Sequence, residues 1–430
     1  MGVLVPELVI KGGRVVDQDG DRLADVAIDG ERIGEVGADL DTTGARVVDA
    51  SGCLVTPGLV DLHTHLREPG KEDAETIESG SRAAVLGGYT AVVAMPNTTP
   101  TIDDAAVVQF VLEAGRKAVC DVHTSAAITV GRQGEALAPM AELAALGVRI
   151  FTDDGSGVQD DRLMRRAMEY AGGLGVILAQ HCEIESLMAG GHMHEGEWSS
   201  RLGIPGIPAA AEELMVQRDL ALVELTGAQV HFQHMSTAGS VELIRAAKAK
   251  GLRVTAEATT HHFTLTHAEV ASYDPVFKVN PPLRTEADVA AIRAGLADGT
   301  IDAIATDHAP HTQQDKEAPF DQAPPGMLGL ETALALALTE LDLPIERILA
   351  LLSWQPAAIA GLSEHHGGPV AAGRSANLCV IDPTAEWVVD PAATASRSRN
   401  TPYAGRSLTG RVRHTVVFGE PVVLDGEVQR

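Results

Sequence analysis

Short apolar runs alternate with longer helix-like stretches through the middle of the chain. The runs that we expect to form strands cover residues 59–63, 90–95, 122–128, 148–152, 176–181, 229–234, 253–259 and 303–306. The stretches that we expect to form helices include 75–86, 105–118, 161–171, 209–225, 240–249 and 286–296. Strands that are regularly followed by helices are typical of a parallel sheet, because each parallel pair needs a crossover connection.

The number and spacing of these units favour one α/β architecture. Eight strand–helix units over roughly 300 residues suit a (β/α)8 barrel, the TIM barrel, which typically needs about 250 residues. A doubly wound sheet is the alternative, but the turn after the first strand carries no Gly-x-Gly-x-x-Gly sequence to favour it. We therefore expect a barrel that spans residues 58–365.

The two ends of the chain differ from the middle. Residues 1–57 contain strand-like runs separated by turn dipeptides such as Asp19-Gly20 and Asp29-Gly30, which favour hairpins. Residues 366–430 return to strands, among them 378–381, 387–389 and 411–418. Because both ends share this β-rich character, we expect them to pair in a small β-sandwich beside the barrel.

Composition and charge narrow the classes of partner. The chain has 430 residues, of which 45% are hydrophobic, and a formal net charge of −26. This charge disfavours nucleic acid and anionic membrane surfaces as partners, although an anionic small substrate needs only a local cationic pocket. We expect no transmembrane helix and a cytoplasmic protein whose four widely spaced cysteines are free thiols.

Two histidines at the end of the first expected barrel strand are the first candidate metal ligands in the sequence. His63 and His65 are separated by one residue, so their side chains point the same way from a strand and can reach one metal ion. Arg67 is the next residue on that side and offers a planar fork of donors to a carboxylate. Alone, the pair is a weak signal, since polar residues are common at a strand edge.

Acidic and imidazole side chains also follow other predicted strands. Active sites of (β/α)8 barrels lie at the carboxyl ends of the strands, so these residues are expected at one rim. Four imidazoles and two carboxylates can hold two divalent ions, with one carboxylate shared. Asp153 competes with its neighbour Asp154 for the shared position, and adjacent residues point apart. The candidate ligands are His63, His65, either Asp153 or Asp154, His181, His234 and Asp307.

Several of these segments resemble a known enzyme family. Residues 61–70, with the sequence DLHTHLREPG, resemble the first dihydroorotase signature, and residues 305–311, ATDHAPH, with Lys316 five residues on, resemble the second. The segments at 151–155, 180–183 and 233–237 are similar to the long, bacterial-type (class I) dihydroorotases of the amidohydrolase superfamily. The resemblance covers nearly the whole chain.

The resemblance implies a zinc site that holds one or two ions. It assigns His63, His65 and Asp307 to one ion, His181 and His234 to the other, and Asp154 to the bridge between them. The commonest bridge in the superfamily is a carbamylated lysine, and no lysine lies near residues 152–155. This difference argues against a hydantoinase or an allantoinase, which are the alternative cyclic amidohydrolases.

The activity that the resemblance implies is the reversible cyclisation of N-carbamoyl-L-aspartate to L-dihydroorotate plus water, in de novo pyrimidine (UMP) biosynthesis. Asp307 is the expected catalytic residue, which takes a proton and passes it to the leaving nitrogen. A non-catalytic homologue that only scaffolds a partner is the second alternative, although such a protein should have lost ligands. The family also suggests a homodimer and an association with aspartate transcarbamoylase.

The substrate contacts are expected around the same rim. Arg67 should bind the substrate carboxylate as a bidentate cation. By resemblance, Asn97 and His311 assist it, and Asn280 contacts the ring amide; for the two asparagines, turn formation beside proline is the alternative. Residues 312–327 are expected to form a mobile loop over the site, with Pro325 and Gly326 offering backbone groups, and an ordinary surface loop is the alternative.

The remaining histidines are expected to have structural roles. Residues 192–194 repeat the His-x-His spacing in a glycine-rich stretch, and we interpret them as a surface loop. His261 and His262 follow the seventh strand and should brace the site. His123 is expected to be packed or hydrogen-bonded, and residues 365–366 to form a linker.

Overall fold

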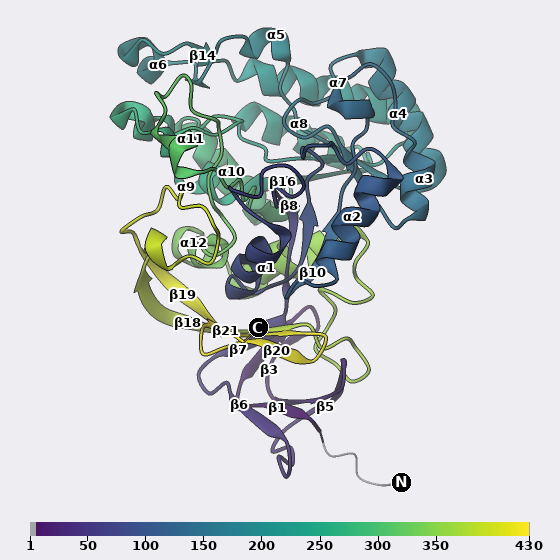
Figure 1. Ribbon diagram of the computed structural model, residues 1–430, viewed down its shortest axis with the longest axis vertical. Helices are drawn as coiled ribbons and strands as arrows, with labels where there is room; N and C mark the ends of the chain where they lie inside the picture. Colours follow the sequence, from purple (N-terminus) through teal and green to yellow (C-terminus); the bar gives the residue numbers. More distant parts are fainter. Residues whose placement is uncertain (1–5, 430) are drawn as a thin grey trace.

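The computed structural model describes residues 6–429 of the chain. Its helix-rich part lies above a strand-rich part that contains the first and the last described strands (Figure 1). Among the described residues, no helix is both long and apolar enough to cross a lipid bilayer. The four cysteines are all free and buried.

Parallel strands form the centre of the helix-rich part, one at each position expected from the sequence. They are β8 (Leu59–Thr64), β9 (Tyr89–Ala94), β10 (Asp121–Thr124), β11 (Ile150–Thr152), β12 (Ile177–Gln180), β15 (Val230–Phe232), β16 (Val254–Thr259) and β17 (Ala303–Ala305). They form two sheets, in the orders β10-β9-β8 and β11-β12-β15-β16-β17. Parallel bridges from Ala126 to Phe151 and from Thr64 to His308 connect the two sheets at both edges.

Helices follow these strands and cover their outer faces. The six expected helices are α1 (Ile77–Leu86), α2 (Ala105–Gly115), α4 (Asp161–Leu174), α7 (Ala210–Thr226), α8 (Ala238–Ala249) and α10 (Glu286–Asp298). Side chains at the N-caps explain where several begin: Asp104 accepts hydrogen bonds from the first backbone N–H groups of α2, and Thr285 forms a capping box at α10. The apolar faces of helices and strands share one large buried core.

Shorter elements complete this part. The elements not expected from the sequence pattern are eight helices and two two-residue strands: α3 (Met140–Ala145), α5 (Glu185–Met188), α6 (Glu197–Leu202), α9 (Thr260–Thr264), α11 (Gln313–Glu317), α12 (Ala333–Glu340), α13 (Ile345–Leu349), α14 (Gln355–Ala360), β13 (Met193–His194) and β14 (Gly206–Ile207). Most of them lie in long connections, where short apolar segments give little periodicity.

The two ends of the chain pair with each other, as expected. One sheet has the order β5-β4-β1-β6 and the other β21-β20-β19-β18-β7-β2-β3. Their strands are β1 (Leu8–Lys11), β2 (Arg14–Asp17), β3 (Gly20–Leu23), β4 (Asp25–Asp29), β5 (Arg32–Gly37), β6 (Arg46–Asp49), β7 (Leu54–Pro57), β18 (Leu378–Val388), β19 (Ser407–Val417), β20 (Glu420–Leu424) and β21 (Glu427–Val428). The antiparallel pair β7–β18 joins the two ends.

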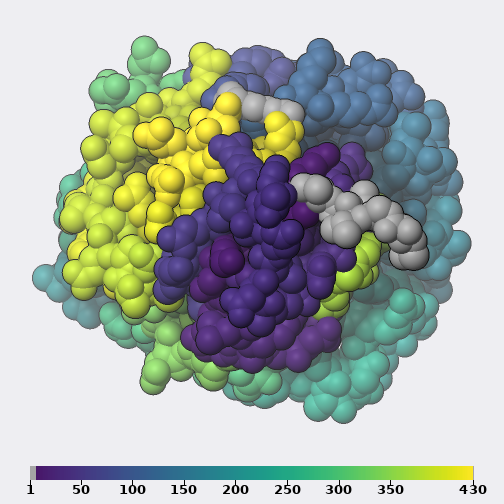
Figure 2. Space-filling view, turned by 90° about the horizontal axis from the view of Figure 1, so that it is seen from below, coloured from purple at the N-terminus to yellow at the C-terminus, as the bar shows by residue number. Residues whose placement is uncertain are grey.

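The two sheets share a second buried core. Ile10 and Ile28 enter it from the four-stranded sheet, and Val55 and Val380 from the seven-stranded sheet. Seen from below, the purple N-terminal residues lie beside the yellow C-terminal strands (Figure 2). The strands from the two terminal parts of the chain therefore pack near the amino ends of the parallel strands.

Candidate active site

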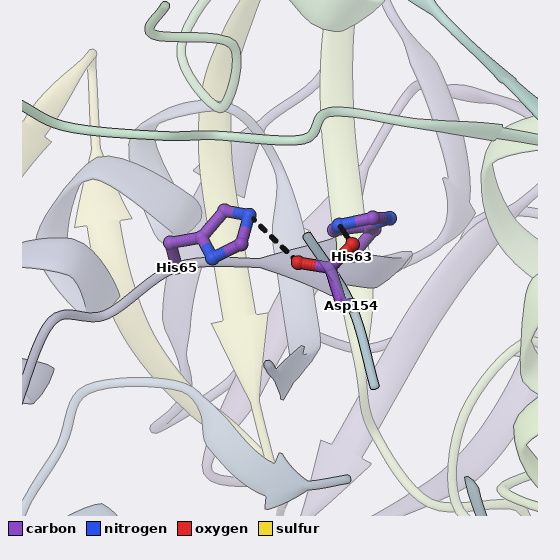
Figure 3. Close-up of side chains that lie close together, drawn as sticks. All are labelled: His63, His65 and Asp154. Carbon is purple, nitrogen blue, oxygen red and sulfur yellow. Dashed lines mark ion pairs between the residues drawn. The ribbon is translucent and has the colours of Figure 1, made fainter. Parts of the chain in front are cut away.

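Three of the predicted ligands meet where β8 and β11 end. His63 Nε2 lies 3.3 Å from Asp154 Oδ1, and His65 Nε2 lies 3.6 Å from Asp154 Oδ2 (Figure 3). All three side chains are buried. The spacing of one residue between the histidines thus points both rings at the same carboxylate, as expected for a strand.

Two further histidines approach this carboxylate from the other side. His181 Nδ1 lies 3.5 Å and His234 Nε2 lies 3.7 Å from Asp154 Oδ1, and these two nitrogens are 2.8 Å apart. Asp307 Oδ1 lies 3.0 Å from His65 Nε2. The structure therefore brings all six predicted ligands together, with Asp154 between the two histidine pairs.

The neighbouring aspartate points elsewhere. Asp153 Oδ1 accepts hydrogen bonds from the backbone N–H groups of Ile128 and Thr129, at 2.8 and 3.0 Å, and Oδ2 accepts one from the Thr129 hydroxyl. Asp153 therefore holds the connection after β10, and of the two aspartates only Asp154 lies among the histidines.

Buried glutamates orient two of the imidazoles. His63 Nδ1 lies 2.8 Å from Glu257 Oε1, and His181 Nε2 lies 2.8 Å from Glu183 Oε2. A neutral imidazole carries one N–H, and its hydrogen bond to a carboxylate leaves the other nitrogen as a metal ligand. This pairing directs Nε2 of His63 and Nδ1 of His181 toward Asp154. Neither glutamate is predictable as an orienting residue from the sequence pattern alone.

Asn97 has the same orienting position at the third imidazole. Its Oδ1 accepts a hydrogen bond from His65 Nδ1 at 2.9 Å, and its Nδ2 donates one to Asp154 Oδ2 at 3.2 Å. Asn97 is therefore tied to two of the predicted ligands, in addition to bordering the cavity described below.

The cluster has the chemistry of a divalent-cation site. His63 Nε2 is buried and has no hydrogen-bond partner among the described residues, although it faces two carboxylates. A mixed set of imidazole nitrogens and carboxylate oxygens is typical of zinc and similar ions. The groups His63–His65–Asp154 and Asp154–His181–His234 each keep their donor atoms within 4.8 Å of one another. The residues therefore fit a pair of cations that share Asp154.

Charges within the cluster keep its carboxylates ionised. Burial alone would raise the pKa of Asp154, but the surrounding histidines, His63 first, hold that pKa well below its usual value. The pKa of Asp307 is lowered against burial in the same way. The pKa of His63 is raised well above its usual value, because Asp154 and Asp307 outweigh the effect of burial.

Backbone strain accompanies three of the predicted site residues. Arg67, His234 and Asp307 have φ values of 59°, 36° and 44°, in the left-handed region that side chains other than glycine rarely adopt. Such conformations are costly and tend to occur at functional sites, where the surrounding structure maintains them.

A cavity of about 160 Å³ opens beside the cluster. The predicted ligands that line it are His65, Asp154, His181, His234 and Asp307. All six predicted substrate residues also line it, namely Arg67, Asn97, Asn280, His311, Pro325 and Gly326. Arg67 donates a hydrogen bond from Nε to the Pro310 carbonyl at 3.1 Å, and its Nη2 lies 3.4 Å from His311 Nε2. A guanidinium therefore lies in the same small space as the cluster.

The loop of residues 312–327 contributes to the cavity wall through Pro324, Pro325 and Gly326. Lys316 Nζ donates hydrogen bonds to the carbonyls of Pro275 and Pro324, at 3.0 and 2.8 Å. Burial lowers the pKa of Lys316 to about 7. The loop is thus connected to the segment near Pro275, and its mobility stays a prediction.

One of the structural interpretations of other histidines is wrong. His194 is not in a surface loop: it is buried in β13, with Nδ1 3.2 Å from Arg284 Nη1. Residues 365–366 lie in the connection between α14 and β18, as expected for a linker, and His366 is buried and hydrogen-bonded there. His261 is buried beside the cluster, and His262 Nε2 donates to the Pro281 carbonyl at 3.0 Å. A short glycine-rich stretch gives no sign of such burial.

Comparison with known proteins identifies the family to which the chain is related. A model of the family described as Dihydro-orotase-like matches residues 52–240. The dihydroorotase of Pelotomaculum thermopropionicum is 51% identical over 97% of this chain and 99% of its own length, and that of Streptomyces coelicolor is 49% identical over 98% and 99%.

Solved structures give the fold independently. The L-hydantoinase (dihydropyrimidinase) from Arthrobacter aurescens aligns with a TM-score of 0.88 at 25% identity, over 99% of this chain and 97% of that one. The dihydropyrimidinase from Brevibacillus agri aligns with a TM-score of 0.86 at 23% identity, over 98% and 96%. The fold is thus that of the cyclic amidohydrolases, and the full-length relatives show that the chain belongs to the dihydroorotase family.

Proposed function

We propose that this chain is a dihydroorotase of de novo pyrimidine biosynthesis, a cyclic amide hydrolase that interconverts N-carbamoyl-L-aspartate and L-dihydroorotate plus water. One observation carries the proposal: five members of the six-residue cluster and Arg67 line one cavity of about 160 Å³. A substrate with an amide beside a carboxylate needs both groups in this arrangement. Full-length relatives named Dihydroorotase support the assignment.

The metal of this metal-dependent family is proposed to be zinc, at one or two ions per chain. His63, His65 and Asp307 would hold one ion, His181 and His234 the other, and Asp154 would bridge them. When bound, the ions would polarise the ring carbonyl and lower the pKa of the attacking water.

Asp307 is the proposed proton carrier. It borders the cavity, and its lowered pKa keeps it ionised and able to accept a proton. In hydrolysis it takes a proton from the attacking water and delivers it to the ring nitrogen as the carbon–nitrogen bond breaks. In cyclisation it removes the proton from the attacking carbamoyl nitrogen and delivers it to the leaving water.

Arg67 and its neighbours are proposed to hold the substrate carboxylate. The Nε of Arg67 is used by the Pro310 carbonyl, so the two Nη groups remain for a bidentate contact. His311 lies beside them, and Asn97 faces the cavity from the side of the cluster. Asn280 is proposed to contact the ring amide, and Pro325 and Gly326 are proposed to offer backbone groups to the ring.

The alternatives are less well supported by the residues. A hydantoinase or allantoinase would carry a lysine where this chain has Asp153 and Asp154. A non-catalytic scaffold would have no reason to keep six ligands, three orienting partners and an adjacent guanidinium in one place. The hydantoinase-like fold alone does not distinguish these activities, because one fold can carry enzymes that hydrolyse different cyclic amides.

The architecture is inferred to be a closed (β/α)8 barrel of residues 58–365 with a β-sandwich built from residues 1–57 and 366–430. The bridges between the two parallel sheets and the core shared by the terminal sheets support this division. A cytoplasmic location, a homodimer and an association with aspartate transcarbamoylase are proposed on family grounds.

The test is substrate turnover by the purified protein. L-Dihydroorotate hydrolysis, followed by the ultraviolet absorbance of the ring, should be fast, and hydantoin and allantoin should react at least about a hundredfold more slowly. The reverse cyclisation of N-carbamoyl-L-aspartate should proceed with the same preparation. Preference for hydantoin would contradict the proposal.

A further inference from the structure

A second group of potential metal ligands lies outside the candidate active site. Asp121 Oδ2 is 3.1 Å from His123 Nε2 and 2.9 Å from His366 Nε2. The donor atoms of these three residues all lie within 4.8 Å of one another. The group joins the segment of Asp121 and His123 to the segment of His366, and the two histidines are 243 positions apart in the sequence.

This group is at the opposite end of the parallel strands from the active site. Asp121 is the first residue of β10, whereas the predicted metal ligands lie at or just beyond the carboxyl ends of their strands. His366 follows α14, and its ring lies 5.6 Å from the ring of Phe418, just after β19. The group therefore lies where the helix-rich part meets the seven-stranded sheet, near the lower end of β10 (Figure 1).

A hydrogen-bonded partner is already present to orient His366 as a metal ligand. Thr90 Oγ1 lies 3.1 Å from His366 Nδ1 and 3.5 Å from the carbonyl of Leu59. The hydroxyl can accept the imidazole N–H and donate its own proton to this carbonyl. Metal-binding histidines usually have such a partner on the ring nitrogen that faces away from the ion.

The group also has room for water ligands and access from solvent. The side chains of Asp121 and His123 are 29% and 33% exposed. His123 and Thr124 line a neighbouring cavity of about 210 Å³. The net charge of −26 favours a cation at the surface of the chain.

We propose that Asp121, His123 and His366 form an additional site for a divalent transition-metal ion of the zinc class. Two imidazole nitrogens, one carboxylate oxygen and a water would complete a tetrahedral set. In such a set, ligands about 2.0–2.1 Å from the ion lie a little over 3 Å from one another, so the distances to Asp121 Oδ2 require only small shifts. The ion would link β10 to the segment after α14 and stabilise the fold without taking part in catalysis.

The experiment uses the purified holoenzyme with its active-site metal in place. Equilibrium dialysis against buffered free Zn²⁺, followed by metal analysis, counts the ions bound by the wild-type protein and by His123→Ala. His365→Ala is the matched control, because His365 is the neighbouring histidine and its Nδ1 contacts Ser375 and not Asp121. Dihydroorotate hydrolysis is measured in parallel to show that the active site is intact in each protein.

The wild type and His365→Ala should bind one more ion than His123→Ala at saturation. At free Zn²⁺ about 100-fold above the dissociation constant, the melting temperature should rise by about 3 °C in these two proteins and not in His123→Ala. Equal zinc uptake by all three proteins would overturn the proposal, as would absence of uptake beyond the active-site metal. Asp121→Asn provides a second variant if His123→Ala does not fold, and it should also lose the additional ion.

Discussion

Replacing Glu257 with glutamine tests how the cluster is held. Glu257 accepts a hydrogen bond from His63 Nδ1 at 2.8 Å and another from His231 Nε2 at 3.0 Å. All three side chains are buried, and the two histidines lower the pKa of Glu257 to about 2 despite its burial. Glutamine keeps the shape of the side chain but removes the charge that fixes the proton on Nδ1 of His63.

The structure indicates the size of the effect. Loss of a carboxylate that orients a metal-binding histidine typically lowers metal affinity about 10–100-fold, or about 1.4–2.7 kcal/mol. We expect the upper part of this range, because Glu257 and His63 are fully buried and water cannot replace the lost acceptor. Dihydroorotate turnover should fall under limiting zinc and recover partly when zinc is raised.

The assay is zinc binding measured by competition with a chelator, at pH 7 and constant ionic strength. The control is Glu331→Gln, at a glutamate whose oxygen accepts hydrogen bonds from Thr394 and from the Ala395 backbone. Glu331→Gln should leave the zinc affinity within about twofold of wild type, although its own stability can change. If Glu257→Gln also binds zinc within twofold of wild type while both variants stay folded, His63 is not a ligand oriented by Glu257.

Three further predictions concern the same site. Asp307→Asn should lower kcat by about 10²–10⁴-fold with an unchanged circular dichroism spectrum, and near-normal turnover would remove it from proton transfer. Arg67→Lys should raise KM for N-carbamoyl-L-aspartate by about tenfold or more, because an ammonium cannot make the bidentate contact; steady-state kinetics would show an unchanged KM if Arg67 were only structural. Dialysis against a strong chelator should abolish turnover and added Zn²⁺ should restore it, whereas full activity in a metal-free preparation would contradict the metal requirement.

Much of the fold is visible in the sequence because the parallel strands are buried on both faces. Such strands read as short apolar runs, and the polar residue that ends each run marks the rim. β12 illustrates this: Ile177–Gln180 is buried throughout, and His181 follows directly. The six predicted ligands were found because each lies at or just beyond a strand end.

The residues that orient these ligands were harder to predict. Glu257 lies inside β16, where a charged residue in a buried strand has no local explanation. Its partner His63 is 194 positions away in the sequence, so only the folded structure shows the contact. Glu183 follows His181 by only two residues, but this spacing alone does not predict the hydrogen bond between them.

The bounds of the C-terminal strands are hard to predict from the sequence for a different reason. Residues 378–381 and 387–389 were expected as separate strands, whereas β18 runs from Leu378 to Val388 with register shifts against β19. A β-bulge inserts unpaired residues without ending the strand, and the polar stretch around Asp382 therefore looks like a turn in the sequence. The Asp382 carboxylate accepts hydrogen bonds from the backbone N–H groups of Thr384 and Ala385, and these bonds supply the turn-like character locally.

Asp61, which is proposed to bind neither metal nor substrate, holds together the two strands β8 and β17 at the site. Asp61 Oδ1 accepts hydrogen bonds from the backbone N–H groups of His63 at 3.3 Å and Thr306 at 3.0 Å, and Oδ2 accepts from the hydroxyls of Thr64 and Thr306. It thereby connects β8, the strand that contains His63, to the end of β17, the strand that precedes Asp307. Burial raises the pKa of this carboxyl, so its ionised form depends on these four donors. The first and last signature segments are therefore coupled through Asp61 before any metal binds, which explains how ligands so far apart in the sequence reach one cluster.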